Sequence, residues 1–131
     1  MATKEQIVLP SRFEREPKEV SVICTAKDAS STIERTIRSI LAQDSQNCEM
    51  IIVDNGSIDD TVSIINAFTK ADPGIRLIAT GGIGRGRALN VALTEAEADL
   101  VCNIDADDES HPSRLRYQLE VMKRCPDLPS R

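Results

Sequence analysis

MIIVDNGSIDDTVSIINAF, residues 50–68, contains one complete strand-to-helix unit. Its apolar run at 50–53 has the length and β-branched content of a buried strand. A polar turn at 54–57 follows, and the Ser57-x-x-Asp60 spacing, typical of a capping box, predicts that a helix begins there. Apolar residues then recur at helical spacing until the turn signal at 72–74, which predicts the end of the helix (Val62, Ile65, Phe68; Asp72, Pro73, Gly74).

The same unit occurs around this stretch. Strand-like runs at 20–24, 75–79 and 100–104 are each followed by an amphipathic segment of helical length. A capping box at Ser31-x-x-Glu34 predicts the start of the helix after the first run, and Pro112 suits the first turn of the last helix. Alternating strands and helices predict an α/β fold with a mostly parallel sheet and flanking helices. We expect an N-terminal extension at 1–19 and one folded domain at 20–131.

Composition narrows the possible function classes. The net charge of −5 does not provide the basic surface that nucleic acids require, so no nucleic-acid partner is expected. No apolar run has the roughly 20 residues that span a bilayer, and no signal peptide is evident, which predicts a cytoplasmic protein. The four cysteines show no zinc-ligand spacing, and Cys24 and Cys102 are predicted to be small buried hydrophobic residues.

Polar and glycine-rich segments follow all four predicted strands. Thr25 follows the first, Asp54 and Asn55 the second, a loop with four glycines and two arginines the third, and the acidic segment 105–108 the fourth. In a parallel sheet of this kind, ligands bind outside the carboxyl ends of the strands. The sequence therefore places these segments together at one edge.

The acidic segment after the fourth strand is a candidate metal site. Asp105, Asp107 and Asp108 concentrate carboxylates that repel one another unless a cation lies among them, and Mg²⁺ or Mn²⁺ prefers such oxygen ligands. The alternative is a solvated acidic loop that caps the next helix. A calcium-binding loop is excluded because Ser110 and Arg116 occupy its glycine and glutamate positions.

The glycine loop at 81–86 matches neither common nucleotide-binding motif. Arg87 stands where a dinucleotide-binding loop needs its third glycine, and Arg87-Ala88 replaces the Lys-Ser/Thr pair of a P-loop. Arg85 and Arg87 remain as cations suited to a base or a diphosphate, or as solvated surface residues.

Four motifs in this order resemble the N-terminal half of family 2 glycosyltransferases: VSVICT at 20–25, IVDNGSIDDT at 52–61, GRGRALN at 84–90 and NIDADD at 103–108. The resemblance extends to about Leu128. It implies a Rossmann-like GT-A fold that binds nucleotide-diphosphate sugars, here truncated, and an inverting transfer of sugar to an acceptor with a divalent metal. It also places polysaccharide biosynthesis among the expected pathways.

The resemblance also implies roles for individual residues. Cys24, Thr25 and Ala26 would line the base through their backbone, and Asp54 and Asn55 would contact its edge. Either Arg85 or Arg87 would reach the base or diphosphate. Asp105 would lie in the ribose and metal shell and Asp107 would ligate the metal, with Asp108 a further candidate. A UDP-sugar is the favoured donor, with dTDP- or GDP-sugars as alternatives, and the acceptor is unspecified.

The family places its catalytic base in the second half of the domain, and no residue here is assigned that role. We therefore expect this chain to bind donor but to be inactive alone. The alternative is a non-catalytic nucleotide-binding or interaction module. A truncated sheet would leave apolar surface and a strand edge uncovered, so self-association is a further expectation, as is peripheral membrane association of the full enzyme.

Overall fold

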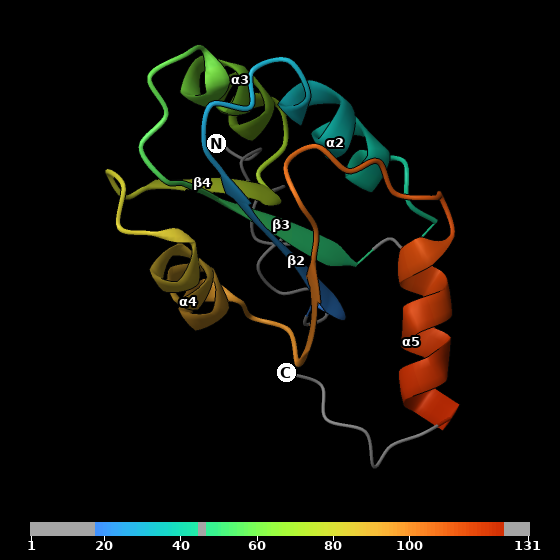
Figure 1. Ribbon diagram of the computed structural model, residues 1–131. Coiled ribbons are helices and arrows are strands. Elements are labelled where there is room, and N and C mark those ends of the chain that lie inside the picture. The colour runs from blue at the N-terminus through green and yellow to red at the C-terminus, as the bar shows by residue number, and fades with distance from the viewer. Residues whose placement is uncertain (1–17, 45–46, 125–131) are drawn as a thin grey trace, which may run out of the picture.

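The computed structural model describes residues 18–44 and 47–124, and within these ranges it contains one four-stranded parallel sheet with helices on both faces (Figure 1). The remaining parts of the expected extension at 1–19 and domain at 20–131 lie outside the described residues. The elements alternate along the chain: β2 (Val20–Ala26), α2 (Ile33–Leu41), β3 (Cys48–Asp54), α3 (Thr61–Ala71), β4 (Ile75–Ala79), α4 (Arg85–Glu95), β5 (Leu100–Asn103) and α5 (Arg114–Arg124). The α/β class is confirmed.

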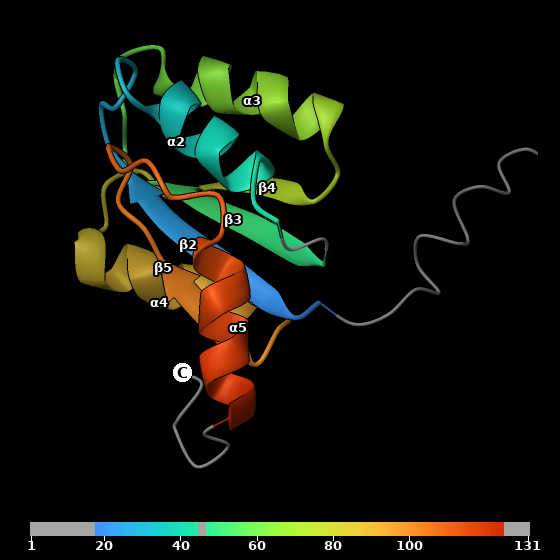
Figure 2. The same cartoon turned by 90° about the vertical axis from the view of Figure 1, so that its right-hand side faces the viewer.

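The strand order β4-β3-β2-β5 contains a reversal of direction. From β2 the chain proceeds to β3 and β4, and it then crosses back to pair β5 with the other edge of β2. Because parallel crossovers are right-handed, this reversal places α4 on the opposite face of the sheet from α2 and α3 (Figure 2). β2 and β5 therefore flank the topological switch point, where ligands of such sheets bind.

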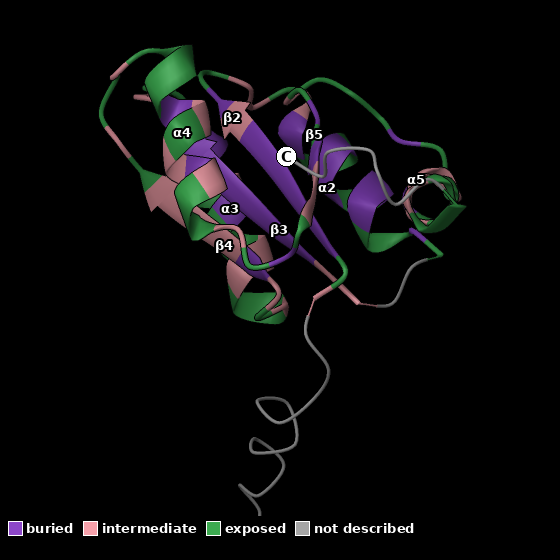
Figure 3. Ribbon diagram, turned by 90° about the horizontal axis from the view of Figure 1, so that it is seen from below, coloured by how far each residue is buried: buried purple, intermediate pink, exposed green. Residues whose placement is uncertain are grey.

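Two apolar clusters hold the layers together. Alternate strand residues face α2 and α3, whose isoleucines lie over them, and Leu115 of α5 joins this cluster. The intervening strand residues face Ala88 and Ala92 of α4 in a smaller cluster (Ile23, Ile51, Val53). Burial on both faces explains why the strands read as continuous apolar runs, and Figure 3 shows β2 and β3 buried along most of their length.

Cys24 and Cys102 are both buried in the larger cluster, which confirms their predicted role as small hydrophobic residues. Burial, together with the nearby carboxylates of Asp105 and Asp108, raises the pKa of the Cys24 thiol to about 12. Cys24 is therefore a protonated packing residue at neutral pH.

The predicted helix starts were wrong at three places. The N-cap residues of α2 and α3 form no side-chain cap. Ser57 bonds to Asp54 and Asp28 instead of capping, and α3 begins only at Thr61. Thr32, the N-cap residue of α2, directs its hydroxyl to the carbonyl of Ala106. α5 begins at Arg114, beyond Pro112, whose carbonyl accepts a bond from the Asp44 amide. Ser57 and Thr32 thus bond to neighbouring loops, while the Thr61 amide at the start of α3 is bound locally by the Asp59 carboxylate.

Among the helices in the described ranges, none combines the length and the apolar character that crossing a bilayer requires.

Candidate functional site

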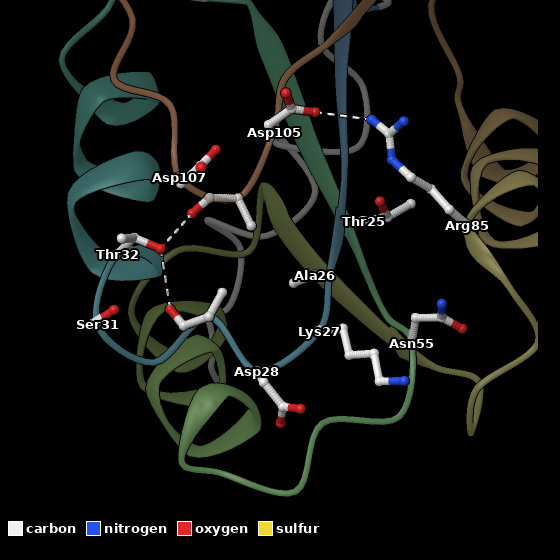
Figure 4. Close-up of a pocket in the computed structure, with 12 residues that line it drawn as sticks. Thr25, Ala26, Lys27, Asp28, Ser31, Thr32, Asn55, Arg85, Asp105 and Asp107 are labelled. Carbon is white, nitrogen blue, oxygen red and sulfur yellow. Dashed lines mark hydrogen bonds and ion pairs between the residues drawn. The ribbon is translucent and has the colours of Figure 1, made fainter.

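A pocket of about 520 Å³ lies at the carboxyl ends of the strands (Figure 4). Its wall comes from the segment after β2, from Asn55 after β3, from Arg85 at the start of α4, and from residues 105–107 after β5. Its volume falls within the range of roughly 300–1,000 Å³ that small-molecule sites usually have. The pocket thus occupies the switch point between β2 and β5.

One end of the pocket is acidic. Carboxylate oxygens of Asp105, Asp107 and Asp108 lie within 4.8 Å of one another, and all three residues are exposed. Asp105 forms an ion pair with Arg85 at 2.9 Å, and the Asp108 carboxylate accepts the Asp105 amide at 3.2 Å. In the part of the chain that the structure describes, the Asp107 carboxylate has no hydrogen-bond or ion-pair partner. Hard oxygen ligands at this spacing fit a divalent ion such as Mg²⁺ or Mn²⁺.

A polar stripe on α2 holds the acidic loop. Thr32 donates to the Ala106 carbonyl at 3.0 Å, and the buried Thr36 hydroxyl lies 2.9 Å from the same carbonyl and 2.6 Å from that of Asp108. Further along, Ser39 accepts the Ser110 amide, and Gln43 bonds to the backbone of His111 and Leu115. These contacts turn the loop carbonyls inward toward α2, so the carboxylates are free to face the pocket.

The loops after β2 and β3 are joined to each other. The Ser57 hydroxyl donates to the buried Asp54 carboxylate at 2.5 Å and accepts the Asp28 amide at 2.8 Å. Asp28 in turn accepts the Ile58 amide at 2.8 Å, and it adopts φ of 51°, a left-handed conformation uncommon for residues other than glycine. This network fixes the wall that carries Thr25, Ala26 and Lys27.

The structure separates the sequence-predicted site residues into two groups. One group lines the pocket: Thr25, Ala26, Asn55, Arg85, Asp105 and Asp107. Three predicted nucleotide-binding residues do not line it: Cys24, Asp54 and Arg87. The further metal candidate Asp108 is also outside the lining, although its carboxylate belongs to the acidic cluster.

The reasons for these three exclusions are local. The Cys24 side chain alternates into the core beneath α2, and the Asp54 carboxylate is buried and bound to Ser57. Arg87 follows Arg85 by two residues in α4, a rotation of roughly 200°, so the two side chains leave the helix on different sides. Of the two arginines, Arg85 therefore lines the pocket and Arg87 does not.

Sequence reasoning missed part of the wall. Lys27, Asp28, Ser31 and Thr32 also line the pocket. Their position directly after a strand, at the same edge as the predicted residues, was the available signal for them. For the supporting residues of α2, the signal was the 4-3-4 spacing of polar residues between the isoleucines (Thr32, Thr36, Ser39, Gln43).

Comparison with known proteins identifies the family of this chain. The sequence pattern of Glycosyl transferase family 2 matches residues 21–129. A candidate glycosyltransferase of teichuronic acid biosynthesis from Bacillus subtilis, TuaG, is 38% identical over 104 residues, which cover 79% of this chain and 41% of TuaG. The succinoglycan biosynthesis protein ExoO of Rhizobium meliloti is 34% identical over 112 residues, covering 85% of this chain and 31% of ExoO.

Solved structures share the fold. The S. aureus protein TarS (residues 1–349), crystallised with UDP, superposes with a TM-score of 0.75 at 24% identity over 81% of this chain and 32% of that one. The mannosyltransferase PcManGT of Pyrobaculum calidifontis, in complex with GDP-Man and Mn²⁺, gives a TM-score of 0.69 at 28% identity over 82% and 32% of the two chains. The chain thus spans less than half of the length of these relatives, and it belongs to glycosyl transferase family 2.

Proposed function

We propose that this chain forms the donor site of a glycosyltransferase, in which the pocket binds a nucleotide-diphosphate sugar together with Mg²⁺ or Mn²⁺ at Asp105 and Asp107. The observation that carries the proposal is the Asp107 carboxylate, which lies beside the Asp105–Arg85 ion pair at the switch point of the sheet and has no hydrogen-bond or ion-pair partner among the residues that the structure describes. A divalent cation would supply the positive charge that the Asp107 carboxylate lacks, and a dianionic diphosphate would offer Arg85 a further anionic partner.

The comparisons support the ligand class and leave the base open. TarS has been crystallised with UDP and with UDP-GlcNAc, and PcManGT with GDP-Man and Mn²⁺. Family membership supports sugar transfer in general. Inversion of configuration at the anomeric carbon, the metal and the donor are part of the proposal for this chain.

The residues of the pocket have distinct parts in the proposed reaction. A divalent ion, when bound, acts as a Lewis acid that stabilises the negative charge of the departing diphosphate. Asp105 and Asp107 would hold the ion, and Arg85, which pairs with Asp105 in this structure, carries a guanidinium that would bind phosphate oxygens bidentately. Thr25 and Ala26 offer their backbone to the nucleoside. We assign no general base to the acceptor hydroxyl within the described pocket.

A thermal-shift screen tests the proposed ligand class. Nucleotide diphosphates with uracil, thymine, guanine and cytosine are each added with Mg²⁺, with Mn²⁺ or with EDTA. At least one is expected to raise the melting temperature in the presence of metal, because a ligand at 100 times its Kd stabilises the native state by about 2.7 kcal/mol. Inorganic pyrophosphate with metal is the control for diphosphate alone. If no nucleotide shifts melting under any condition, the proposal is wrong.

A further inference from the structure

The amide of Asn55 has a fixed orientation in the pocket wall. Its oxygen accepts the Ile83 backbone amide at 2.8 Å and lies 3.4 Å from the Thr80 hydroxyl. A backbone N–H can only donate, so the atom that faces Ile83 must be the oxygen and not the amide nitrogen. Figure 4 shows the nitrogen on the side of Thr25 and Arg85, with the oxygen turned away from them.

This orientation leaves Asn55 with hydrogen-bond donors only. Both N–H groups of its amide are available to a ligand, and within the described residues no group accepts a bond from them. Lys27 lines the same part of the pocket and is exposed, and its ammonium donors have no acceptor in residues 18–44 and 47–124. In Figure 4 both side chains lie at the end of the pocket away from Asp105, with the Lys27 ammonium below Asn55.

The pocket therefore has two chemically different ends. Asp105 and Asp107 lie at one end with Arg85, and Asn55 and Lys27 lie at the other. Asp28 is the acidic residue on the Lys27 wall, and its carboxylate accepts the Ile58 amide. If the diphosphate and metal occupy the acidic end, the base occupies the end that presents donors.

We propose that Asn55 and Lys27 select a base edge with two adjacent acceptors, and that they discriminate against uracil and thymine. N3 and O2 of cytosine form such an edge, as do N7 and O6 of guanine. Uracil and thymine place the N3–H donor between their two carbonyls, and it would face the Asn55 N–H groups unpaired. This inference rests on the proposed function and departs from the UDP-sugar that the family resemblance implies.

The affinity lost when a donor of the pocket has no acceptor on the base gives the expected size of the base preference. A buried donor left unpaired costs roughly 5- to 150-fold in affinity, and the half-buried Asn55 amide and the exposed Lys27 correspond to the lower part of this range. We expect CDP or GDP, with Mn²⁺, to bind at least about tenfold more tightly than UDP or dTDP. Comparing CDP with GDP identifies which of the two acceptor edges is read.

Asn55→Asp is the decisive variant because it is nearly isosteric. One carboxylate oxygen can still accept the Ile83 amide, while the other replaces the amide nitrogen with an acceptor. The variant should shift the preference toward UDP by about tenfold or more relative to CDP and GDP. The ratio of affinities is the readout, because the added negative charge weakens all diphosphates alike. Asn66→Asp, at an exposed site of α3, is the matched control and should leave the ratio unchanged.

The titrations are made by calorimetry on the intact chain with the nucleotide diphosphates and Mn²⁺. If wild type prefers UDP, or if Asn55→Asp leaves the ranking unchanged, base selection by Asn55 is wrong while the donor site stands. If nucleotides bind with equal affinity whatever the base, the same conclusion holds. If none binds, the donor site itself is wrong and this inference falls with it.

Discussion

Replacing Asp107 with alanine is expected to abolish the effect of Mn²⁺ on nucleotide-diphosphate affinity. The wild-type chain should bind its preferred nucleotide much more tightly with Mn²⁺ than with EDTA, whereas Asp107→Ala should give equal affinities. The expected loss in the presence of metal is about 100-fold or more, since even the outer-shell partners of metal ligands typically contribute 10- to 100-fold. Isothermal titration calorimetry of both proteins, with and without Mn²⁺, provides the comparison.

The fold should tolerate this change. Asp107 is exposed, and within the described part of the chain its carboxylate has no hydrogen-bond or ion-pair partner, so the free energy of unfolding should change by no more than about 0.5 kcal/mol. Asp60→Ala is the charge-matched control, because Asp60 is exposed at the start of α3, caps no amide with its side chain and lies outside the pocket lining. A metal dependence that survives Asp107→Ala, or is lost equally in Asp60→Ala, would contradict the assignment.

Gly56→Ala is expected to produce the largest loss of stability. Gly56 has φ of 89°, and a Cβ there would lie 3.0 Å from the Gly82 amide nitrogen and 3.2 Å from its Cα. Backbone strain and overpacking against main chain that has little room to move should together cost about 2–4 kcal/mol. The clash also pushes the 80–84 loop away from Asn55, which should weaken nucleotide binding. Urea unfolding followed by circular dichroism measures the loss of stability.

Two other glycines separate the contribution of backbone strain from that of overpacking. Gly81 has φ of 79° with no atom within 4 Å of its Cβ position, so Gly81→Ala should show backbone strain alone. Gly86 lies in the first turn of α4 with open space around it, so Gly86→Ala should leave stability unchanged or slightly higher. The expected order of destabilisation is Gly56, then Gly81, then Gly86. Equal losses at Gly56 and Gly81 would show that the contact with Gly82 is unimportant.

Most of the fold could be predicted because its signals are local. Each strand contains a short apolar run, which in β2 and β3 is buried on both faces, and each helix carries apolar residues at helical spacing. Helix starts were harder to predict, because hydroxyls that match a capping motif can bond elsewhere. Ser57 does so, with Asp28 of another loop as its partner, and α2 takes Thr32 instead of the predicted Ser31 as its N-cap residue, with the Thr32 hydroxyl bound to Ala106. A contact of this kind cannot be read from a single segment.

The candidate site shows the same limit. The rule that loops at the carboxyl ends of parallel strands meet was enough to bring Thr25, Asn55 and Asp105 together. Side-chain direction was not available from that rule, so Cys24 and Arg87 were included with residues that line the pocket. The orientation of Asn55 was also out of reach, since it depends on a backbone amide 28 positions further along the chain.

Paramagnetic NMR with Mn²⁺ tests the central claim most directly, because it locates the metal in the folded chain. Spectra of the isotopically labelled protein are recorded with a bound nucleotide diphosphate while Mn²⁺ is added, with Mg²⁺ as the diamagnetic reference. The donor-site assignment predicts that the amide signals of 105–108 and of Thr25 and Ala26 broaden first. Broadening centred on the acidic residues at 59–60, or no selective broadening at all, would contradict it.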